Sequence, residues 1–167
     1  VGPEGSPGRY PPNIFLITGD SNAVFVDTAY GSSEEMKAAL GVWQSNGALP
    51  VSMIALSHRH QDHIGGAHHL SEATGGRVVA HADEIKGISE QLPTLNIDSV
   101  VEEGQTVCLG NATLEFIHTP GHTMGSICVF YREERVLFTG DTILGGSSTA
   151  INPEQGDMGL YIESLKK

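Results

Sequence analysis

Residues 56–66, LSHRHQDHIGG, bring three histidines and one aspartate within six positions. The four side chains are His58, His60, Asp62 and His63, and they follow a short apolar run directly. In an extended segment alternate side chains point to the same side, so His58 and His60 can direct two imidazoles at one point. Asp62 and His63 come where the chain begins to turn, so they can face a second point nearby. Such a set of nitrogen and carboxylate ligands suits zinc or another first-row divalent ion.

A metal site needs further ligands, and the segment HTPGHT at 118–123 offers one. Pro120 and Gly121 force a turn that can present His122. We expect His118, which stands before the turn, to pack or to form a hydrogen bond rather than to bind metal.

The segment LFTGDT at 137–142 offers another ligand. Gly140 permits a close approach of the backbone, and Asp141 follows it. A carboxylate has two oxygens, so Asp141 can bridge two metal ions. The neighbouring His68 and His69 lie on a predicted helix, where we expect them to be surface residues.

The elements around these motifs are short. Alternating or continuous apolar runs predict strands at 14–18, 23–27, 51–56, 77–80, 106–109, 112–118, 126–131 and 135–139. Helical spacing predicts helices after Ser32, up to Thr74, over 83–91 and near the end of the chain. This order of elements predicts an α/β fold with a mixed sheet or two packed sheets.

Two finer expectations concern apolar side chains and thiols. In the last helix, Leu160, Ile162 and Leu165 are expected to contact the core. Cys108 and Cys128 are each in an alternating strand pattern, which predicts two buried thiols.

Composition limits the possible partners. The chain has 167 residues, 39% of them hydrophobic, which is enough for one domain over 13–167 after a flexible Gly/Pro-rich arm at 1–12. Nine basic and twenty acidic residues give a formal charge of −11, which argues against binding to nucleic acid or anionic membranes. No apolar run approaches the roughly 18 to 20 residues of a membrane span. A cytoplasmic protein with a small-molecule substrate is therefore expected.

Taken together, HRHQDH, TPGHT and TGD, with IFLITGDSNAVFVDT ahead of them, resemble the metallo-β-lactamase-fold hydrolases. The resemblance extends from Asn13 onward. The tail from 137 to 167 is similar to the branch that contains beta-lactamase-like protein 2. The resemblance implies an α/β fold of four layers, an αβ/βα sandwich, with two divalent metal ions between the sheet edges.

The same resemblance implies a role for each matching residue. The first metal would be bound by His58, His60 and His122. The second would be bound by Asp62 and His63, with Asp141 as the bridge. Asp27, in the VDT segment, would orient ligands through hydrogen bonds, and Thr123 would do the same.

The match departs from the family's pattern at the end of the chain. Members supply one more histidine to the second metal from beyond the final helix, whereas the last histidine here is His122. Either the chain is a fragment that lacks the C-terminal strand and helix, which we favour, or it is naturally short and its second site is weak. A homodimer could then cover the exposed core.

The chemistry that follows is hydrolysis. A bound divalent ion, zinc first with iron or manganese as alternatives, supplies hydroxide near neutral pH. Asp62 would hold the water and receive its proton. We expect a small ester, thioester or lactone as substrate. The alternatives are a metallo-nuclease, an inactive metal-binding fragment, and an oxidoreductase like the mononuclear iron persulfide dioxygenases, using His58, His122 and Asp141.

Overall fold

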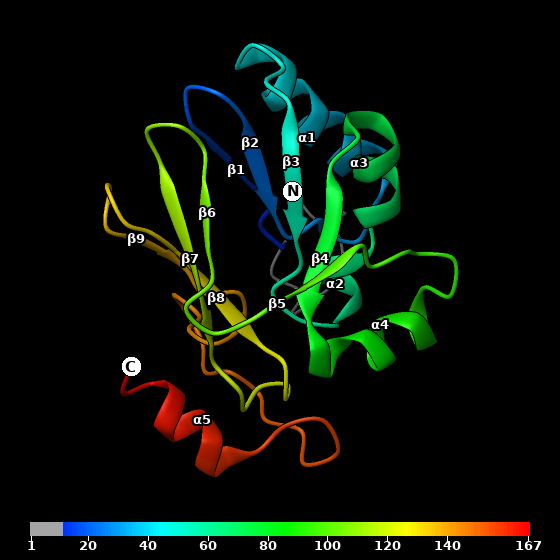
Figure 1. Ribbon diagram of the computed structural model, residues 1–167. Coiled ribbons are helices and arrows are strands. Elements are labelled where there is room, and N and C mark those ends of the chain that lie inside the picture. Colours follow the sequence, from blue (N-terminus) through cyan, green and yellow to red (C-terminus); the bar gives the residue numbers. More distant parts are fainter. Residues whose placement is uncertain (1–11) are drawn as a thin grey trace.

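The computed structural model describes residues 12–167, which form two β-sheets packed face to face with helices on one side (Figure 1). The first sheet has the order β1 (Phe15–Thr18), β2 (Ala23–Val26), β3 (Val51–Ala55), β4 (Arg77–His81) and β5 (Ser99–Val101). The second has the order β6 (Thr106–Cys108), β7 (Thr113–His118), β8 (Ile127–Tyr131) and β9 (Val136–Phe138). The predicted arm at 1–12 lies outside the described residues, except for Pro12.

The helices fall between these strands. They are α1 (Ser33–Ser45), α2 (Gln61–Ile64), α3 (Ala67–Thr74), the short 3₁₀ turn Ala82–Glu84, α4 (Ile85–Gln91) and α5 (Met158–Ser164). Helix α1 begins at the predicted capping box, in which the Ser32 hydroxyl accepts from the Glu35 N–H and the Glu35 carboxylate accepts from the Ser32 N–H. The predicted mixed α/β architecture is confirmed.

The first sheet is mostly parallel because helices connect its strands. Strands β2 to β5 pair in parallel, and β1 joins β2 as the predicted antiparallel hairpin. All four residues of β2 are buried, as expected for a strand that is covered on both faces.

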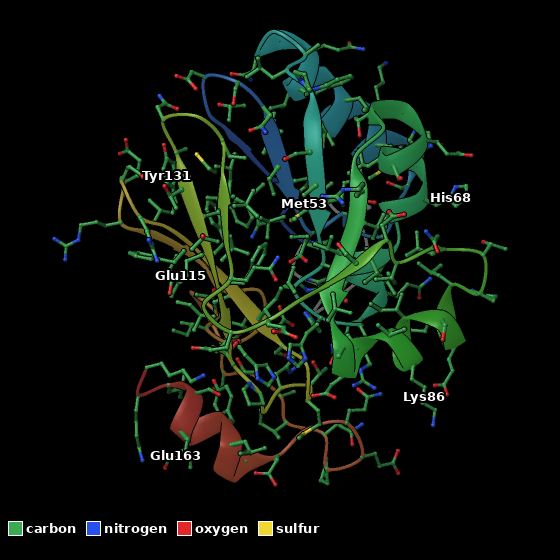
Figure 2. All side chains as sticks on the ribbon, in the orientation of Figure 1. Met53, His68, Lys86, Glu115, Tyr131 and Glu163 are labelled. Atoms are coloured by element: carbon green, nitrogen blue, oxygen red, sulfur yellow. The ribbon has the colours of Figure 1, made fainter. Side chains whose placement is uncertain are left out.

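Two apolar clusters account for this burial. One lies between the sheets and includes Val24, Met53 and Phe116, and Figure 2 shows Met53 in that space. The other lies between the first sheet and the helices and includes Phe25, Ile54 and Leu70. The first sheet therefore forms the middle layer, with helices α1 and α3 on its outer face (Figure 1).

The second sheet is antiparallel, and its strand β7 alternates between buried and partly exposed residues. Over residues 12–167 the one helix after β9 is α5, which packs on the loop that carries His122 rather than along the sheet (Figure 1).

Two of the finer expectations were wrong. Leu160, Ile162 and Leu165 are 39%, 47% and 47% exposed, because α5 touches the rest of the chain mainly through Tyr161 and Ser164. Cys108 is exposed, because it ends an edge strand, whereas Cys128 is buried as expected.

Strand direction sets where the polar motifs meet. Strands β2, β3 and β4 are parallel, so the residues that follow each of them lie at one edge of the first sheet. Strands β7 and β9 are both antiparallel to β8, so they also end at a common edge. The hydrogen bond from the Ile127 N–H to the Ser57 carbonyl joins the two edges at 2.9 Å.

Among the described residues, no helix has both the length and the apolar character that crossing a membrane requires.

Candidate metal centre

Four of the residues that the sequence pointed to meet at the joined sheet edges: His58, His60, His122 and Asp141. One ligand atom from each lies within 4.8 Å of the others. The His60 Nδ1 atom is 2.9 Å from His58 Nε2 and 2.9 Å from His122 Nε2. Residues separated by more than 60 positions along the chain therefore face one point.

The outer nitrogen of each of these rings has an acceptor. His122 Nδ1 faces the Ala150 carbonyl at 2.8 Å, and His60 Nε2 faces the Gln155 Oε1 atom at 2.8 Å. His58 Nδ1 lies 3.0 Å from the Ser57 hydroxyl, which donates its own hydrogen to Asp27. The two carbonyl oxygens can only accept a hydrogen bond, and so can the Ser57 hydroxyl, because it already donates its hydrogen to Asp27. Each outer nitrogen is therefore the donor and carries the ring's proton.

The consequence is that the three inner nitrogens present lone pairs to one another. Lone pairs at 2.9 Å repel unless a cation lies between them. Burial lowers the pKa of His58 well below its usual range and also lowers the pKa of His122, so both rings are held in the neutral form that binds metal. The three ring nitrogens and the Asp141 carboxylate are donors that suit a divalent cation. The hydrogen bonds on the outer side of each ring orient the rings, as is usual for metal-binding histidines.

His63 lies beside this group, between two carboxylates. Its Nδ1 is 2.8 Å from Asp27 and its Nε2 is 3.2 Å from Asp141 Oδ1. Burial disfavours the charged ring, but the carboxylates of Asp27 and Asp141 outweigh burial and raise the pKa of His63 to about 10.

Asp141 faces both histidine groups with different oxygens. Its Oδ1 atom faces His63, and its Oδ2 atom is 3.7 Å from His122 Nε2. Burial alone would raise the pKa of Asp141, but the hydrogen bond and charge of His63, with His122, lower it. The carboxylate is therefore ionised and has one oxygen available on each side.

Asp62 lies outside the four-residue group. It is half-buried and lines a cleft that is also lined by Asp27, His63 and Asp141. Asp62, His63 and Asp141 thus line one cleft, and the His63 ring also lies against His58, with ring centroids 4.1 Å apart.

Asp27 forms hydrogen bonds to residues of the histidine motif. Its carboxylate accepts from the Ser57 N–H at 2.7 Å, from the Ser57 hydroxyl at 2.8 Å and from His63. Its φ of 60° is in the left-handed region, which is costly for a residue other than glycine and is typical of functional sites. Gly140 lies so close that an added Cβ would be 2.6 Å from the Ser57 hydroxyl oxygen.

A buried glutamate links the two loops that carry the histidines. Glu84 Oε2 accepts from the backbone N–H of Arg59 at 2.7 Å and from its Nε at 2.9 Å. Glu84 Oε1 accepts from the Gly125 N–H at 2.7 Å. Arg59 stands between His58 and His60, and Gln91 donates to its carbonyl at 2.7 Å. The 3₁₀ turn after β4 and helix α4 therefore hold the backbone of the ligand loop.

Thr123 is buried near the site, but the structure places it on its own loop. Its hydroxyl lies 2.8 Å from the Ser126 hydroxyl, which also accepts from the Thr123 N–H. It orders the turn after His122 rather than touching a ligand side chain through these bonds.

A second His/Asp group, His81, Asp83 and His118, also has ligand atoms within 4.8 Å of one another. The rings of His81 and His118 stack at 3.9 Å with only 13° between their planes. His118 Nε2 also donates to the Met124 carbonyl, so this nitrogen is already used. His118 packs and forms a hydrogen bond as predicted. His68 and His69 are exposed on α3, as expected.

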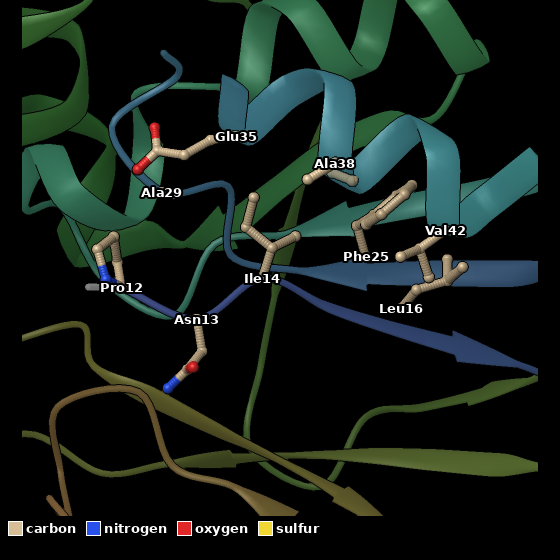
Figure 3. A pocket seen from close by; sticks show the side chains of 10 residues that line it. Pro12, Asn13, Ile14, Leu16, Phe25, Ala29, Glu35, Ala38 and Val42 are labelled. Carbon is tan, nitrogen blue, oxygen red and sulfur yellow. The ribbon is translucent and has the colours of Figure 1, made fainter. Parts of the chain in front are cut away.

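A hollow of about 240 Å³ between β1 and α1 is separate from this centre (Figure 3). It is lined mainly by apolar side chains, including Ile14, Phe25 and Val42. Its one carboxylate, that of Glu35, is used in the helix cap. Among the described residues that line the hollow, no carboxylate other than this one is present.

The sequence did not point to Ser57, Arg59, Glu84, Ala150 or Gln155. Ser57 and Arg59 stand inside the motif and could have been noticed as its neighbours. Glu84 and Gln155 are ordinary polar residues in the sequence, and the Ala150 contact is through its backbone.

These observations define a class of protein: an α/β fold of two packed sheets with a His/Asp metal centre where the sheet edges meet. The chain belongs to the metallo-beta-lactamase superfamily, whose sequence model matches residues 7–167.

Curated relatives include hydrolases. The chain is 33% identical to "Lactamase-like protein nscB" of Aspergillus fumigatus over 92% of its length and 43% of the relative. It is 31% identical to "Atrochrysone carboxyl ACP thioesterase AacuM" of Aspergillus aculeatus over 93% of its length and 46% of the relative. It is 35% identical to "Hydroxyacylglutathione hydrolase" of Rhodospirillum rubrum over 70% of its length and 43% of the relative. The chain thus spans less than half the length of these relatives.

Solved structures agree in fold. The chain superposes on the BLEG-1 B3 metallo-beta-lactamase with a TM-score of 0.75 and 26% identity, over 94% of this chain and 82% of that one. It superposes on TTHA1623 in a di-iron-bound form with a TM-score of 0.72 and 28% identity, over 92% and 79% of the two chains.

The close approach of Gly140 to Ser57 can be tested with a matched pair of glycines. Gly140 and Gly75 both have positive φ, so alanine costs each about 1 kcal/mol in backbone strain. Only Gly140 has a neighbour that the new methyl group would strike, because Gly75 has open space around it. We expect Gly140→Ala to lower the free energy of unfolding by about 1–3 kcal/mol more than Gly75→Ala, measured by urea unfolding. Equal losses would contradict the proposed contact.

The role of Glu84 in linking the two histidine loops can be tested by removing its charge. Glu84→Gln leaves the Arg59 guanidinium without its anion and puts an amide against the Arg59 N–H. We expect a loss of about 2–4 kcal/mol in the free energy of unfolding, measured by chemical denaturation, and weaker binding of added zinc. The control is Glu90→Gln on the exposed side of α4, where we expect a change within about 0.5 kcal/mol. A Glu84→Gln protein as stable as this control would show that Glu84 does not hold the two histidine loops together.

Proposed function

We propose that the chain carries the metal centre of a hydrolase that cleaves a small ester or thioester, with a thioester as the first choice. The observation that carries the proposal is the convergence of three imidazole lone pairs with Asp141 at one point. The names of two relatives, a thioesterase and an acylglutathione hydrolase, support the choice of substrate.

In this proposal His58, His60 and His122 hold one divalent ion. Asp62 and His63 would hold a second, and Asp141 would be shared between the two. A divalent ion in such a site lowers the pKa of water from about 15.7 towards 7, which makes hydroxide available at neutral pH. Zinc is our choice of metal.

The remaining residues orient the ligands and handle the proton. Asp27 and Ser57 hold His63 and His58 in place, and Ala150 and Gln155 fix the proton on the outer nitrogens of His122 and His60. Asp62, which borders the cleft, would orient water and accept its proton. A cytoplasmic location, a homodimer and the absence of nucleic-acid binding stay predictions.

An iron oxidoreductase is the second candidate. The likeness to a protein solved in a di-iron-bound form supports iron as an alternative metal, since the same donor types accept zinc, iron or manganese. X-ray fluorescence of the purified protein separates the two proposals. Zinc or manganese at two sites favours hydrolysis, and one iron at a single site favours oxidation.

The hydrolase proposal is tested by removing one ligand. We expect His60→Ala to lose the first metal and to lower thioester hydrolysis by roughly 100-fold or more, because two imidazoles hold the ion poorly. Metal content is measured by elemental analysis and hydrolysis by thiol release. The control, His69→Ala, removes an exposed imidazole of α3 and should change neither quantity. Full metal content in His60→Ala would refute the assignment.

A further inference from the structure

Helix α5 presents two hydroxyl groups to the loops of the metal centre. Tyr161 and Ser164 are three positions apart, so they lie on one face of the helix. The Tyr161 hydroxyl donates to the Thr142 carbonyl at 3.0 Å, and the Ser164 hydroxyl donates to the Pro120 carbonyl at 2.8 Å. Ser164 is buried, so its hydrogen bond is shielded from water. One face of the helix therefore holds two separate loops.

The two carbonyls lie next to candidate metal ligands. Pro120 stands two residues before His122, and Thr142 directly follows Asp141. The strands that lead into these loops, β7 and β9, do not pair with each other, because β8 lies between them. A hydrogen bond between the Thr119 and Thr142 hydroxyls, 3.0 Å apart, also joins the loops. The spacing of the two loops therefore depends on contacts beyond the ends of the strands, and α5 supplies two of them.

The helix can reach the loops because glycines let it approach. Gly121 has a φ of 142°, which favours glycine, and a Cβ atom added there would overlap the Cα atom of Tyr161. The Asp157 N–H, at the start of α5, donates to the Gly121 carbonyl at 2.9 Å. A Cβ atom added at Gly156 would overlap the same carbonyl oxygen. The start of α5 thus rests on the backbone next to His122, so a shift of the helix would move this loop.

The distance between the two candidate ligands shows what this spacing achieves. His122 Nε2 and Asp141 Oδ2 are 3.7 Å apart. Two ligands of a tetrahedral zinc ion, each about 2.1 Å from the metal, are about 3.4 Å apart. The pair is therefore within a few tenths of an ångström of the distance that an ion requires. A shift of one loop by about 1 Å would lose this arrangement, because such sites tolerate errors of only about 0.5 Å.

We propose that Tyr161 and Ser164 are positioning residues of the metal centre, which hold His122 and Asp141 at the spacing that a shared ion needs. They act through the backbone of the two loops and not by contact with the ion. The inference rests on the metal centre of the proposed function and adds the contacts that set its geometry. Without the two hydroxyls the loops keep their ligands but lose the fixed distance between them, so the ion is bound less tightly.

Binding of cobalt(II) tests the inference, because the visible absorption of this ion reports both the affinity and the geometry of its site. Tyr161→Phe and Ser164→Ala each remove one hydroxyl and keep the rest of the side chain. We expect each variant to bind the first equivalent of cobalt(II) about tenfold more weakly, which is the lower end of the loss usual for indirect supports of a ligand. The absorption bands of the bound ion should change as well.

Two matched control variants remove the same groups elsewhere. Tyr131→Phe changes a tyrosine of β8, whose backbone pairs with Leu114 and Val136. Ser89→Ala changes a serine of α4, whose hydroxyl donates to the Lys86 carbonyl of the same helix. We expect both controls to bind cobalt(II) within about twofold of the unaltered chain and with the same absorption bands.

A loss of stability alone would give a different result. If the two hydroxyls only stabilise α5, both variants will unfold at a lower urea concentration, but the folded protein will bind cobalt(II) with unchanged affinity and unchanged absorption. That result would overturn the inference. Affinity is measured without urea on protein whose folding is checked by circular dichroism, and either variant decides the question if the other does not fold.

Turnover separates this inference from the proposed function. The unaltered, zinc-loaded chain is tested for thioester hydrolysis by thiol release. Weaker cobalt(II) binding in both variants, without hydrolysis by the unaltered chain, would defeat the hydrolase function and support the positioning role. Hydrolysis by the unaltered chain, with unchanged cobalt(II) affinity and absorption in both variants, would defeat the positioning role and support the function.

Discussion

Three imidazole nitrogens that face one point, with His60 Nδ1 2.9 Å from each of the other two, are the constraint on which the rest of the site depends. Each ring directs a lone pair inward, so only a cation between them makes the arrangement favourable. The chain maintains this geometry through bonds on the outer side of each ring, to Ser57, Gln155 and the Ala150 carbonyl. The folded protein therefore keeps ligands close together that would separate without such support.

The two sheets make that support possible. His58 and His60 follow a strand of the first sheet, and His122 and Asp141 follow strands of the second. Where the sheets join, Glu84 holds the backbone next to the first pair and the backbone after His122 at the same time. The left-handed conformation of Asp27 at the same edge costs free energy, which the contacts of its carboxylate offset.

The sequence predicted the strands of the described chain except β5 (Ser99–Val101), the capped helix α1 and the mixed architecture, because each is encoded by local periodicity and capping. It missed β5 because three residues are too few to show a periodicity. It also pointed to the candidate ligand residues, since His58, His60, Asp62 and His63 are close in the chain and His122 and Asp141 belong to a recognisable pattern. It did not predict Glu84 or Gln155, because a buried carboxylate and an amide that meet a loop many residues away leave no local signal. The apolar spacing of α5 was taken for a core face, whereas the described chain leaves Leu160 and Ile162 exposed. Periodicity shows that a helix has an apolar side but not whether anything lies against it.

The segment 150–157 connects the metal centre to α5. It supplies the acceptors for His122 and His60, and its backbone rests directly on the histidine loop, where Asp157 N–H donates to the Gly121 carbonyl at 2.9 Å. Ion affinity and the order of this segment are therefore thermodynamically coupled, and the coupling is reciprocal. A contact that immobilises α5 also orders this segment, so it must raise the affinity of the centre for the ion. The ion must strengthen that contact by the same factor. Binding of another molecule to the exposed face of α5 would thus change the metal occupancy of the centre.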